Sequence, residues 1–403
     1  MRTAIWLYLF LFVAFFDLHA QYPILTPFAV SLGAAPSFIG LMMGLYSITH
    51  LPGNLIAGFG VDRFGSRLFI VFSLGAAGGI LLLQSHVTNP WQLLTLRSIS
   101  GFVLAFLSPA CMSLLARIAT SRVKQRKLMA GNGLVHTLAS VVSPAAGAYL
   151  VAQIGFTTAF SVLGWVLIVT AVCALFFIRD VPMQSALPIG SLHQAKAQAE
   201  LIGMRGEEAK KERPPAIPWL IFLLPIAMSC AQGILSFELP LMSTTKEGMM
   251  TTGLLFSIVS LGALFTLSLL FLNKISPFLR SLWGAFLLAL TYFAIAAGAP
   301  LPFYLLLFFL GMAKGVIFPA LSSLLIERSG GERYGRIFSI LSIAFSIGAF
   351  LGPMLAGQLR NYVSPYYIAF VGLMIAVAVL PFFADSNRTR DARDAGAHFS
   401  HTG

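Results

Sequence analysis

The chain has 403 residues, of which 58% are hydrophobic and only 10% are charged. A soluble domain carries about 25% charged residues and could not bury this much apolar surface, so the composition excludes an ordinary globular protein and indicates a bilayer environment. The formal net charge of +12 does not indicate a nucleic-acid partner, because the basic residues lie in short segments between apolar runs rather than on one soluble face.

Apolar runs long enough to cross a bilayer, about 20 residues each, follow one another along the whole chain. The first six cover 4–31, 36–61, 68–86, 91–117, 128–153 and 156–178, and the second six cover 217–242, 250–272, 279–299, 302–327, 335–360 and 364–384. We therefore predict an all-α membrane protein with twelve transmembrane helices. They form two six-helix halves, 1–178 and 217–384, around a central substrate cavity. A cytoplasmic linker, 179–216, joins the halves, and a cytoplasmic tail, 385–403, follows; the linker stretch 191–202 is predicted to be a surface helix.

Lysine and arginine are concentrated on the face that both termini share. The opposite face has only Lys246 and Arg360. The positive-inside rule then predicts a multi-pass protein of the cell (inner) membrane with both termini in the cytoplasm. The loop residues on the basic face are Arg63, Arg67, Arg117, Arg122, Lys124, Arg126, Lys127, Lys274, Arg280, Arg328, Arg333 and Arg336.

The two halves repeat one another. Gly101 to Pro109 and Gly311 to Pro319 both read G-x7-P, and each is followed by Ser-Leu-Leu. Ser143-Pro144-x-x-Gly147 corresponds to Gly352-Pro353-x-x-x-Gly357. Such a duplication predicts a solute site at the midplane between two halves that rock around it.

A turn between the second and third apolar runs carries five constrained residues in the pattern G-x-x-x-D-R-x-G-x-R. They are Gly58, Asp62, Arg63, Gly65 and Arg67. The pattern resembles the signature loop between helices 2 and 3 of the major facilitator superfamily of transporters, which implies solute transport rather than enzyme activity. The corresponding loop of the second half, 273–280, has no acidic residue.

The signature loop is expected to control conformational switching. Asp62 lies at the end of a helix, where the helix dipole disfavours an anion. The family resemblance implies that Asp62 contacts the start of the eleventh span, near Tyr334 and Gly335, and latches the inward-closed state. The alternative is a simple positive-inside turn.

Several ionisable residues fall within the predicted spans, and we single out six of them as groups inside the membrane. A charge at mid-bilayer costs about 2.5–3.5 kcal/mol on insertion scales, so each should face the interior of the bundle. They are Asp17, His19, Arg97, His136, Glu238 and Lys314. We assign Lys314, Gln21, His136, Phe237 and Tyr46, which follows Leu45, to the substrate cavity, and regard the two histidines as interior polar residues.

Three of these residues are candidates for proton coupling. Arg97, in L-x-x-R-x-x-x-G, resembles the helix 4 motif of proton-coupled superfamily members, although an interfacial arginine near Trp91 is the alternative. Glu238 is expected at mid-span, and its Phe-Glu context resembles bacterial twelve-helix drug–proton antiporters. It could instead be the partner of Lys314, and Asp17 could be a second proton carrier or that partner.

Small residues and prolines mark sites of helix packing. Ser143 to Gly147 resembles the antiporter motif G-P-x-x-G, with serine in place of the first glycine, which favours exchange over symport. General packing is the alternative. We assign Gly101, Pro144, Gly147 and Pro353 to close helix contacts.

The leading hypothesis is proton-coupled efflux of small, partly apolar compounds. The alternative is an organic-anion or metabolite transporter in which Arg97 and Lys314 clamp the anion; a non-transporting sensor or a lipid scramblase is a third class. No Walker A, H-E-x-x-H or nucleophile-elbow pattern occurs, and the cysteines Cys111, Cys173 and Cys230 form no C-x-x-C pair. We therefore predict no catalytic residue, cofactor or metal. The expected partners are a small-molecule substrate, protons and lipid, with the chain as a monomer.

Overall fold

The computed structural model describes residues 2–119, 121–180, 219–242, 245–269, 272, 274–328 and 334–383, and these residues are almost entirely helical. The predicted linker helix at 191–202 and the tail lie outside them. The first half contains α1 (Arg2–Ala20), α2 (Tyr22–Ser31), α3 (Pro36–Phe64), α4 (Ser66–Gln84), α5 (Pro90–Leu104), α6 (Leu107–Arg117) and α7 (Arg122–Phe177). The second contains the short η2 (Trp219–Phe222), then α9 (Leu223–Leu241), α10 (Lys246–Ser268), α11 (Pro277–Ala296), α12 (Phe303–Arg328), α13 (Tyr334–Leu359), α14 (Pro365–Val379) and η4 (Leu380–Phe383).

These elements correspond in order to the predicted spans, with breaks at prolines and glycine. Pro109 has no N–H for the carbonyl of Ala105, and the fourth span divides there into α5 and α6. The first span divides at Gln21, before Pro23, into α1 and α2. The 56-residue α7 contains two spans joined at Gly155, whose φ of 78° is the left-handed conformation that glycine favours.

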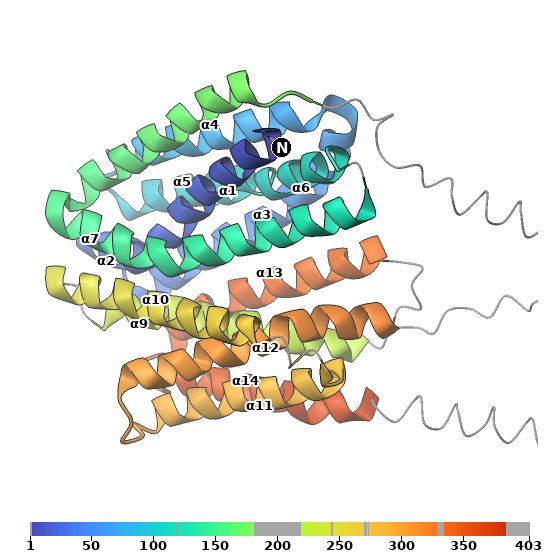
Figure 1. Cartoon of the computed structure of the whole chain (residues 1–403). Helices are drawn as coiled ribbons and strands as arrows, with labels where there is room; N and C mark the ends of the chain where they lie inside the picture. The colour runs from blue at the N-terminus through green and yellow to red at the C-terminus, as the bar shows by residue number, and fades with distance from the viewer. Residues whose placement is uncertain are drawn as a thin grey trace, which may run out of the picture.

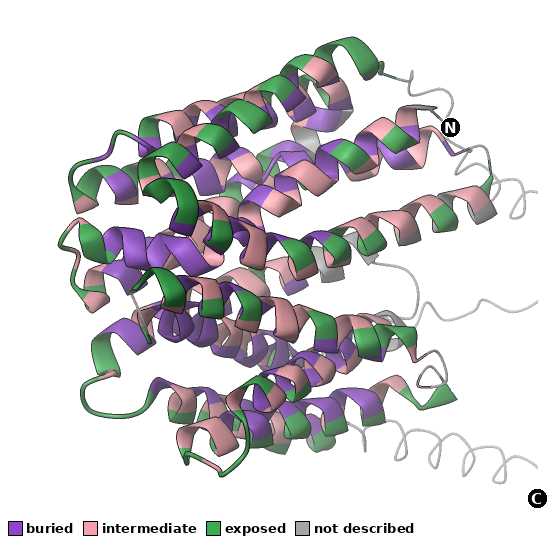
Figure 2. Ribbon diagram, turned by 60° about the vertical axis from the view of Figure 1, so that its left-hand side comes forward, coloured by how far each residue is buried: buried purple, intermediate pink, exposed green. Residues whose placement is uncertain are grey.

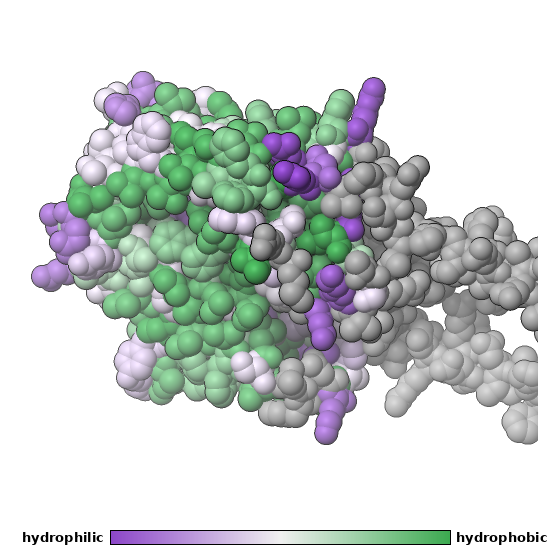
Figure 3. Space-filling view, turned by 45° about the horizontal axis from the view of Figure 1, so that its top comes forward, coloured by the Kyte–Doolittle hydropathy of each residue, from purple (hydrophilic) through white to green (hydrophobic). Residues whose placement is uncertain are grey.

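The surface of the helices is that of a multi-pass membrane protein. Within the described residues, nine helices are long and apolar enough to cross a bilayer, including the stretch of α7 that contains two spans. Figure 2 shows that many helices are buried along one side and exposed along the other. Figure 3 shows apolar side chains over the middle of one face, with hydrophilic residues towards its two ends. The predicted all-α membrane fold is confirmed.

The two halves form two helical bundles that lie against each other (Figure 1). The glycines of the sequence repeat pack equivalently in them. A Cβ atom on Gly101 of α5 would meet the carbonyl oxygen of Tyr46 in α3, and one on Gly311 of α12 would meet that of Val259 in α10. These glycines allow two backbones to approach in a way that a side chain would prevent.

The other repeat motif also lies at close helix contacts. Gly147 of α7 packs against the backbone of Ala20 in α1, and Gly352 of α13 packs against that of Cys230 in α9. The ring of Pro353 faces Gly233 of α9. The sequence repeat therefore corresponds to a repeat of helix–helix contacts.

The halves are in close contact near one end of the bundle. Gly40 of α3 lies against the carbonyl group of Pro353, and Gly357 of α13 lies against that of Pro36. Gly253, near the start of α10, lies against the carbonyl oxygen of Pro144. These contacts are at the end opposite to the signature loop and to the ends of α7 and η2 that border the linker (left in Figure 1).

Candidate functional site

A cavity of about 940 Å³ lies between the two halves. It is bounded on one side by α1, α2, α6 and α7 and on the other by α9, α10 and α12. From the contact of Gly253 with Pro144, the cavity extends along α7 to Asn132 and along α10 to Ser268. It therefore lies towards the end where the linker is attached, which is the predicted cytoplasmic side. Its volume is in the range of cavities that hold drug-sized molecules.

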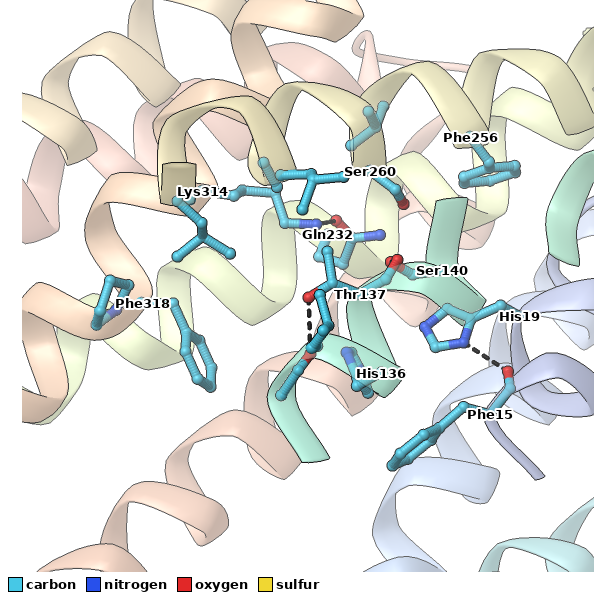
Figure 4. Close-up of a pocket in the computed structure, with 18 of the residues that line it drawn as sticks. Phe15, His19, His136, Thr137, Ser140, Gln232, Phe256, Ser260, Lys314 and Phe318 are labelled. Carbon is cyan, nitrogen blue, oxygen red and sulfur yellow. Dashed lines mark hydrogen bonds between the residues drawn. The ribbon is translucent and has the colours of Figure 1, made fainter. Parts of the chain in front are cut away.

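The polar groups of the cavity are basic or neutral. Lys314 of α12 lines it and donates a hydrogen bond to the side-chain oxygen of Gln232 in α9, a helix of the same half (Figure 4). His19 of α1 and His136 of α7 approach with ring centroids 5.1 Å apart. The His19 ring also bonds the carbonyl oxygen of Phe15 at 2.7 Å. No aspartate or glutamate lines the cavity in the described part of the chain.

The apolar part of the cavity wall combines aliphatic side chains, such as Leu134 and Val259, with aromatic rings. Among the aromatic residues, Phe15 packs edge-on against His136, with 4.7 Å between the ring centroids. Phe256 of α10 lies 6.0 Å from Tyr22, ring to ring, and Phe318 of α12 lies near Lys314 (Figure 4). A flat or elongated apolar group would find ring surfaces on both halves of the protein.

Beside the cavity, Asp17, Gln21 and Arg97 form one buried cluster. The amide nitrogen of Gln21 donates to both carboxylate oxygens of Asp17 at 3.0 Å. The Arg97 guanidinium donates to the amide oxygen of Gln21 at 2.6 Å. Gln21 therefore links an acid on α1 to a cation on α5. The guanidinium also lies over the ring of Tyr46, 4.5 Å from its centroid.

Arg97 is only 6% exposed, so the alternative of an arginine that reaches the membrane interface is wrong. It also does not line the central cavity. Arg97 and Lys314 are therefore separate features of the structure and do not form one clamp.

Glu238 lies elsewhere than expected. It is near the end of α9, three residues before Leu241, and not at mid-span. Its carboxylate lies 3.7 Å from the guanidinium of Arg360, at the end of α13. It neither lines the central cavity nor contacts Lys314. The prediction was wrong because apolar residues flank Glu238 in the sequence. Hydropathy alone therefore did not show how near Glu238 lies to the end of the span, which begins at η2.

Three of the residues assigned to the cavity are also placed differently. Gln21 is buried in the cluster with Asp17. Tyr46 contacts Arg97 and lines a smaller crevice between α3 and α13. Phe237 is completely buried in the apolar core. Lys314 and His136 are the assigned residues that line the cavity, because the side chains of α7 and α12 at these positions face the space between the halves.

The signature loop is bound by a residue of the segment that follows α7. Gly65 has a φ of 89°, which glycine adopts without strain. The carboxylate of Asp180 accepts hydrogen bonds from the backbone N–H groups of Ser66 and Arg67, at 2.9 and 3.0 Å. These N–H groups lie at the start of α4 and have no carbonyl partner within the helix, so an anion is favourable there. The Arg67 side chain donates to the carbonyl oxygen of Leu175.

The side chains of the expected latch between the loop and α13 lie outside the described residues. The guanidinium of Arg63 lies 5.4 Å from the ring of Phe64. The side chains at Gly58 and Asp62, and those at the start of α13 near Tyr334 and Gly335, lie outside the described residues.

Sequence reasoning missed three partners. Gln232 holds Lys314, Arg360 pairs with Glu238, and Asp180 caps α4. The available signal for Gln232 was a polar amide within an otherwise apolar span, four residues before Ser236. In the sequence, Arg360 and Asp180 resemble ordinary loop charges. Only the folded structure shows that Arg360 lies beside Glu238 and that Asp180 lies at the start of α4.

Comparisons with known proteins agree with this architecture. The family model described as Major Facilitator Superfamily matches residues 7–301 and 278–399. A crystal structure of a bacterial homolog to the human lysosomal transporter Spinster, in an inward-facing and occupied conformation, has a TM-score of 0.72. It is 15% identical and covers 95% of this chain and 96% of its own. That likeness concerns the fold.

The sequence is also similar to curated efflux proteins. A multi-drug resistance efflux pump PmrA homolog from Lactococcus lactis subsp. lactis (strain IL1403) is 25% identical, over 89% of this chain and 87% of the relative. The multidrug resistance protein MdtG of Escherichia coli (strain 55989 / EAEC) is 27% identical over the same shares. The resemblance extends over almost the whole length of both proteins.

Proposed function

Because the chain belongs to the Major Facilitator Superfamily, whose family model matches most of its length, we propose that it exports small, partly apolar compounds in exchange for protons. It is a multi-pass membrane transporter and not an enzyme. In this proposal the protein is a monomer of the cell (inner) membrane. Both termini are cytoplasmic, and the cavity faces the cytoplasm in this conformation.

One observation carries the proposal: α1 has a different role on each of two faces. Asp17 and Gln21, which directly follows α1, are four residues apart and share the side that is turned to Arg97. Phe15 and His19, also four residues apart, share the face that lines the cavity. A change in the charge of Asp17 therefore acts on the same helix that touches the substrate.

Protonation is the step that changes this cluster. When Asp17 takes up a proton, its carboxyl group loses the negative charge that offsets Arg97 and becomes a hydrogen-bond donor. The Gln21 amide, which now donates to both carboxylate oxygens, then loses one of its acceptors. The link between α1 and α5 weakens, and α1 moves against the cavity, so that proton uptake and substrate release alternate.

Glu238 remains a second candidate for coupling, at a different place. It lies with Arg360 at the end of the bundle where the halves are in contact. An acid at that end would take up protons from the side of the membrane opposite to the cytoplasm. Glu238 would then load from that side, while Asp17 responds beside the cavity.

The test is proton movement in proteoliposomes that contain a pH-sensitive dye. Aromatic anions, cations and neutral compounds are added in turn to wild type, Asp17→Asn, Glu238→Gln and the control Glu247→Gln. Glu247 is exposed in the first turn of α10. We expect Asp17→Asn to abolish substrate-driven proton movement and to retain exchange of labelled for unlabelled substrate. Proton movement at the wild-type rate in Asp17→Asn would contradict the proposed coupling.

A further inference from the structure

The cavity contains one cation whose observed partner is neutral. Lys314 donates to the amide oxygen of Gln232, and the amide nitrogen of Gln232 donates to Ser236 at 3.1 Å. Within the described ranges, no carboxylate lies at salt-bridge distance from the lysine. The two acids that the sequence suggested as its partners bind other residues: Asp17 is bonded to Gln21, and Glu238 pairs with Arg360.

This charge pattern decides which sign of substrate is favourable. A permanent cation in the cavity would meet Lys314 in surroundings of low dielectric, and no acid among the described lining residues would compensate it. An anion there would instead supply the missing counter-charge. A hydrogen bond between two charged groups is also stronger than the present bond to an amide.

The remainder of the wall requires an apolar body on that anion. Phe256 and Phe318 line the cavity on the second half, together with Met228, and Phe15 lines it on the first. Figure 4 shows Phe318 and Phe256 on either side of the Lys314–Gln232 pair. A small inorganic anion would leave these rings without contact, whereas an aromatic or aliphatic acid would fill them.

We infer that the cavity binds amphiphilic organic anions, whose carboxylate or sulfonate group replaces the Gln232 oxygen on Lys314 while the apolar body lies against the phenylalanines. This inference rests on the proposed transport function and names its substrate class. It also distinguishes this chain from a site built for lipophilic cations, which would place an acid in the cavity.

Binding calorimetry on the purified full-length protein in nanodiscs tests the inference without a proton gradient. The probes are three molecules with one ring system: naphthalene-2-sulfonate, 2-naphthylmethylammonium and 2-naphthalenemethanol. We expect the sulfonate to bind about tenfold or more tightly than the alcohol, and the ammonium to bind most weakly. Lys314→Met should weaken sulfonate binding about 10- to 100-fold and leave the alcohol unchanged.

Three further variants sharpen the result. Lys314→Arg keeps the charge and should keep the sulfonate preference. Gln232→Glu places an acid beside Lys314 and should reduce sulfonate binding about tenfold while it improves ammonium binding. Lys246→Met removes a lysine that is exposed at the start of α10, outside the cavity, and should change nothing.

Equal binding of the three probes, or a sulfonate preference that persists in Lys314→Met, would overturn the inference. The outcome is separate from that of the proposed function. Sulfonate binding that depends on Lys314 but drives no proton movement supports the substrate class and refutes the coupling. Proton movement driven by the ammonium and unaffected in Lys314→Met supports the coupling and refutes the substrate class.

Discussion

Replacing Gly40 by alanine should force the closed end of the molecule apart. A Cβ atom there would overlap the carbonyl oxygen of Pro353, lie 3.0 Å from its carbonyl carbon and lie 3.4 Å from the Cα of Met354. All three are backbone atoms, so no side chain can rotate away. Because α3 and α13 belong to different halves, the overlap is relieved when the halves separate at this end.

The size of the effect follows from the cost of overpacking. Inserting a methyl group where no space exists costs about 1–3 kcal/mol. If the whole cost falls on the closed conformation, its population relative to the open one falls by about 5- to 150-fold. The open conformation would then gain population by the same factor relative to the closed one.

Spin-label distances measure this population directly. Labels at Thr157→Cys and Tyr362→Cys report on the two halves. Thr157 is exposed in α7 just after the break at Gly155, and Tyr362 is exposed in the turn after α13. The three native cysteines are replaced by alanine first. We expect a longer distance to gain population in Gly40→Ala.

The matched control is Gly79→Ala on α4, where a Cβ atom meets nothing within 4 Å. It should leave the distance distribution as in wild type. Identical distributions in Gly40→Ala and Gly79→Ala would refute the claim that this glycine contact holds the halves together.

Two further predictions concern the Glu238–Arg360 ion pair and the cap at the start of α4. Arg360→Met leaves the carboxylate of Glu238 without its cation and should lower the free energy of unfolding by about 1–2 kcal/mol, less than for a fully buried pair because the arginine side chain is 29% exposed. The double variant with Glu238→Gln should recover most of this loss of thermal stability in detergent. An unchanged melting temperature in Arg360→Met would show that the pair contributes nothing. Asp180→Ala removes the acceptor of two N–H groups at the start of α4 and should cost about 0.5–2 kcal/mol. Asp180→Asn should cost less, because it keeps an oxygen acceptor, and equal losses in both variants would contradict this cap.

Much of the fold was predictable because its signals are local. Runs of about 20 apolar residues predict spans wherever a bilayer is the solvent, and the described helices follow these runs in order. The repeat of Gly101 with Gly311 was visible in sequence, and the structure gives it a physical meaning as two equivalent backbone contacts. The break before Pro109 follows from its missing N–H.

The candidate site was predictable in its members more than in its arrangement. The cost of burying a charge singled out Asp17, Arg97 and Lys314, and the structure places all three inside the bundle. Their partners were not predictable. Lys314 could have paired with either acid by sequence, yet it binds an amide 82 residues away.

Local patterns in the sequence indicated the bilayer environment and the order of the helices, as well as the motifs that carry the duplication and the family resemblance. Each of these is recorded in short runs of residues. The folded bundle, in contrast, shows that Gln21 links Asp17 to Arg97, that Glu238 lies with Arg360 away from the cavity, and that no acid among the described residues lines the cavity wall. The physical reason is that a charge is compensated across helices. Which faces of two helices meet depends on the packing of the whole bundle, and no local pattern records it.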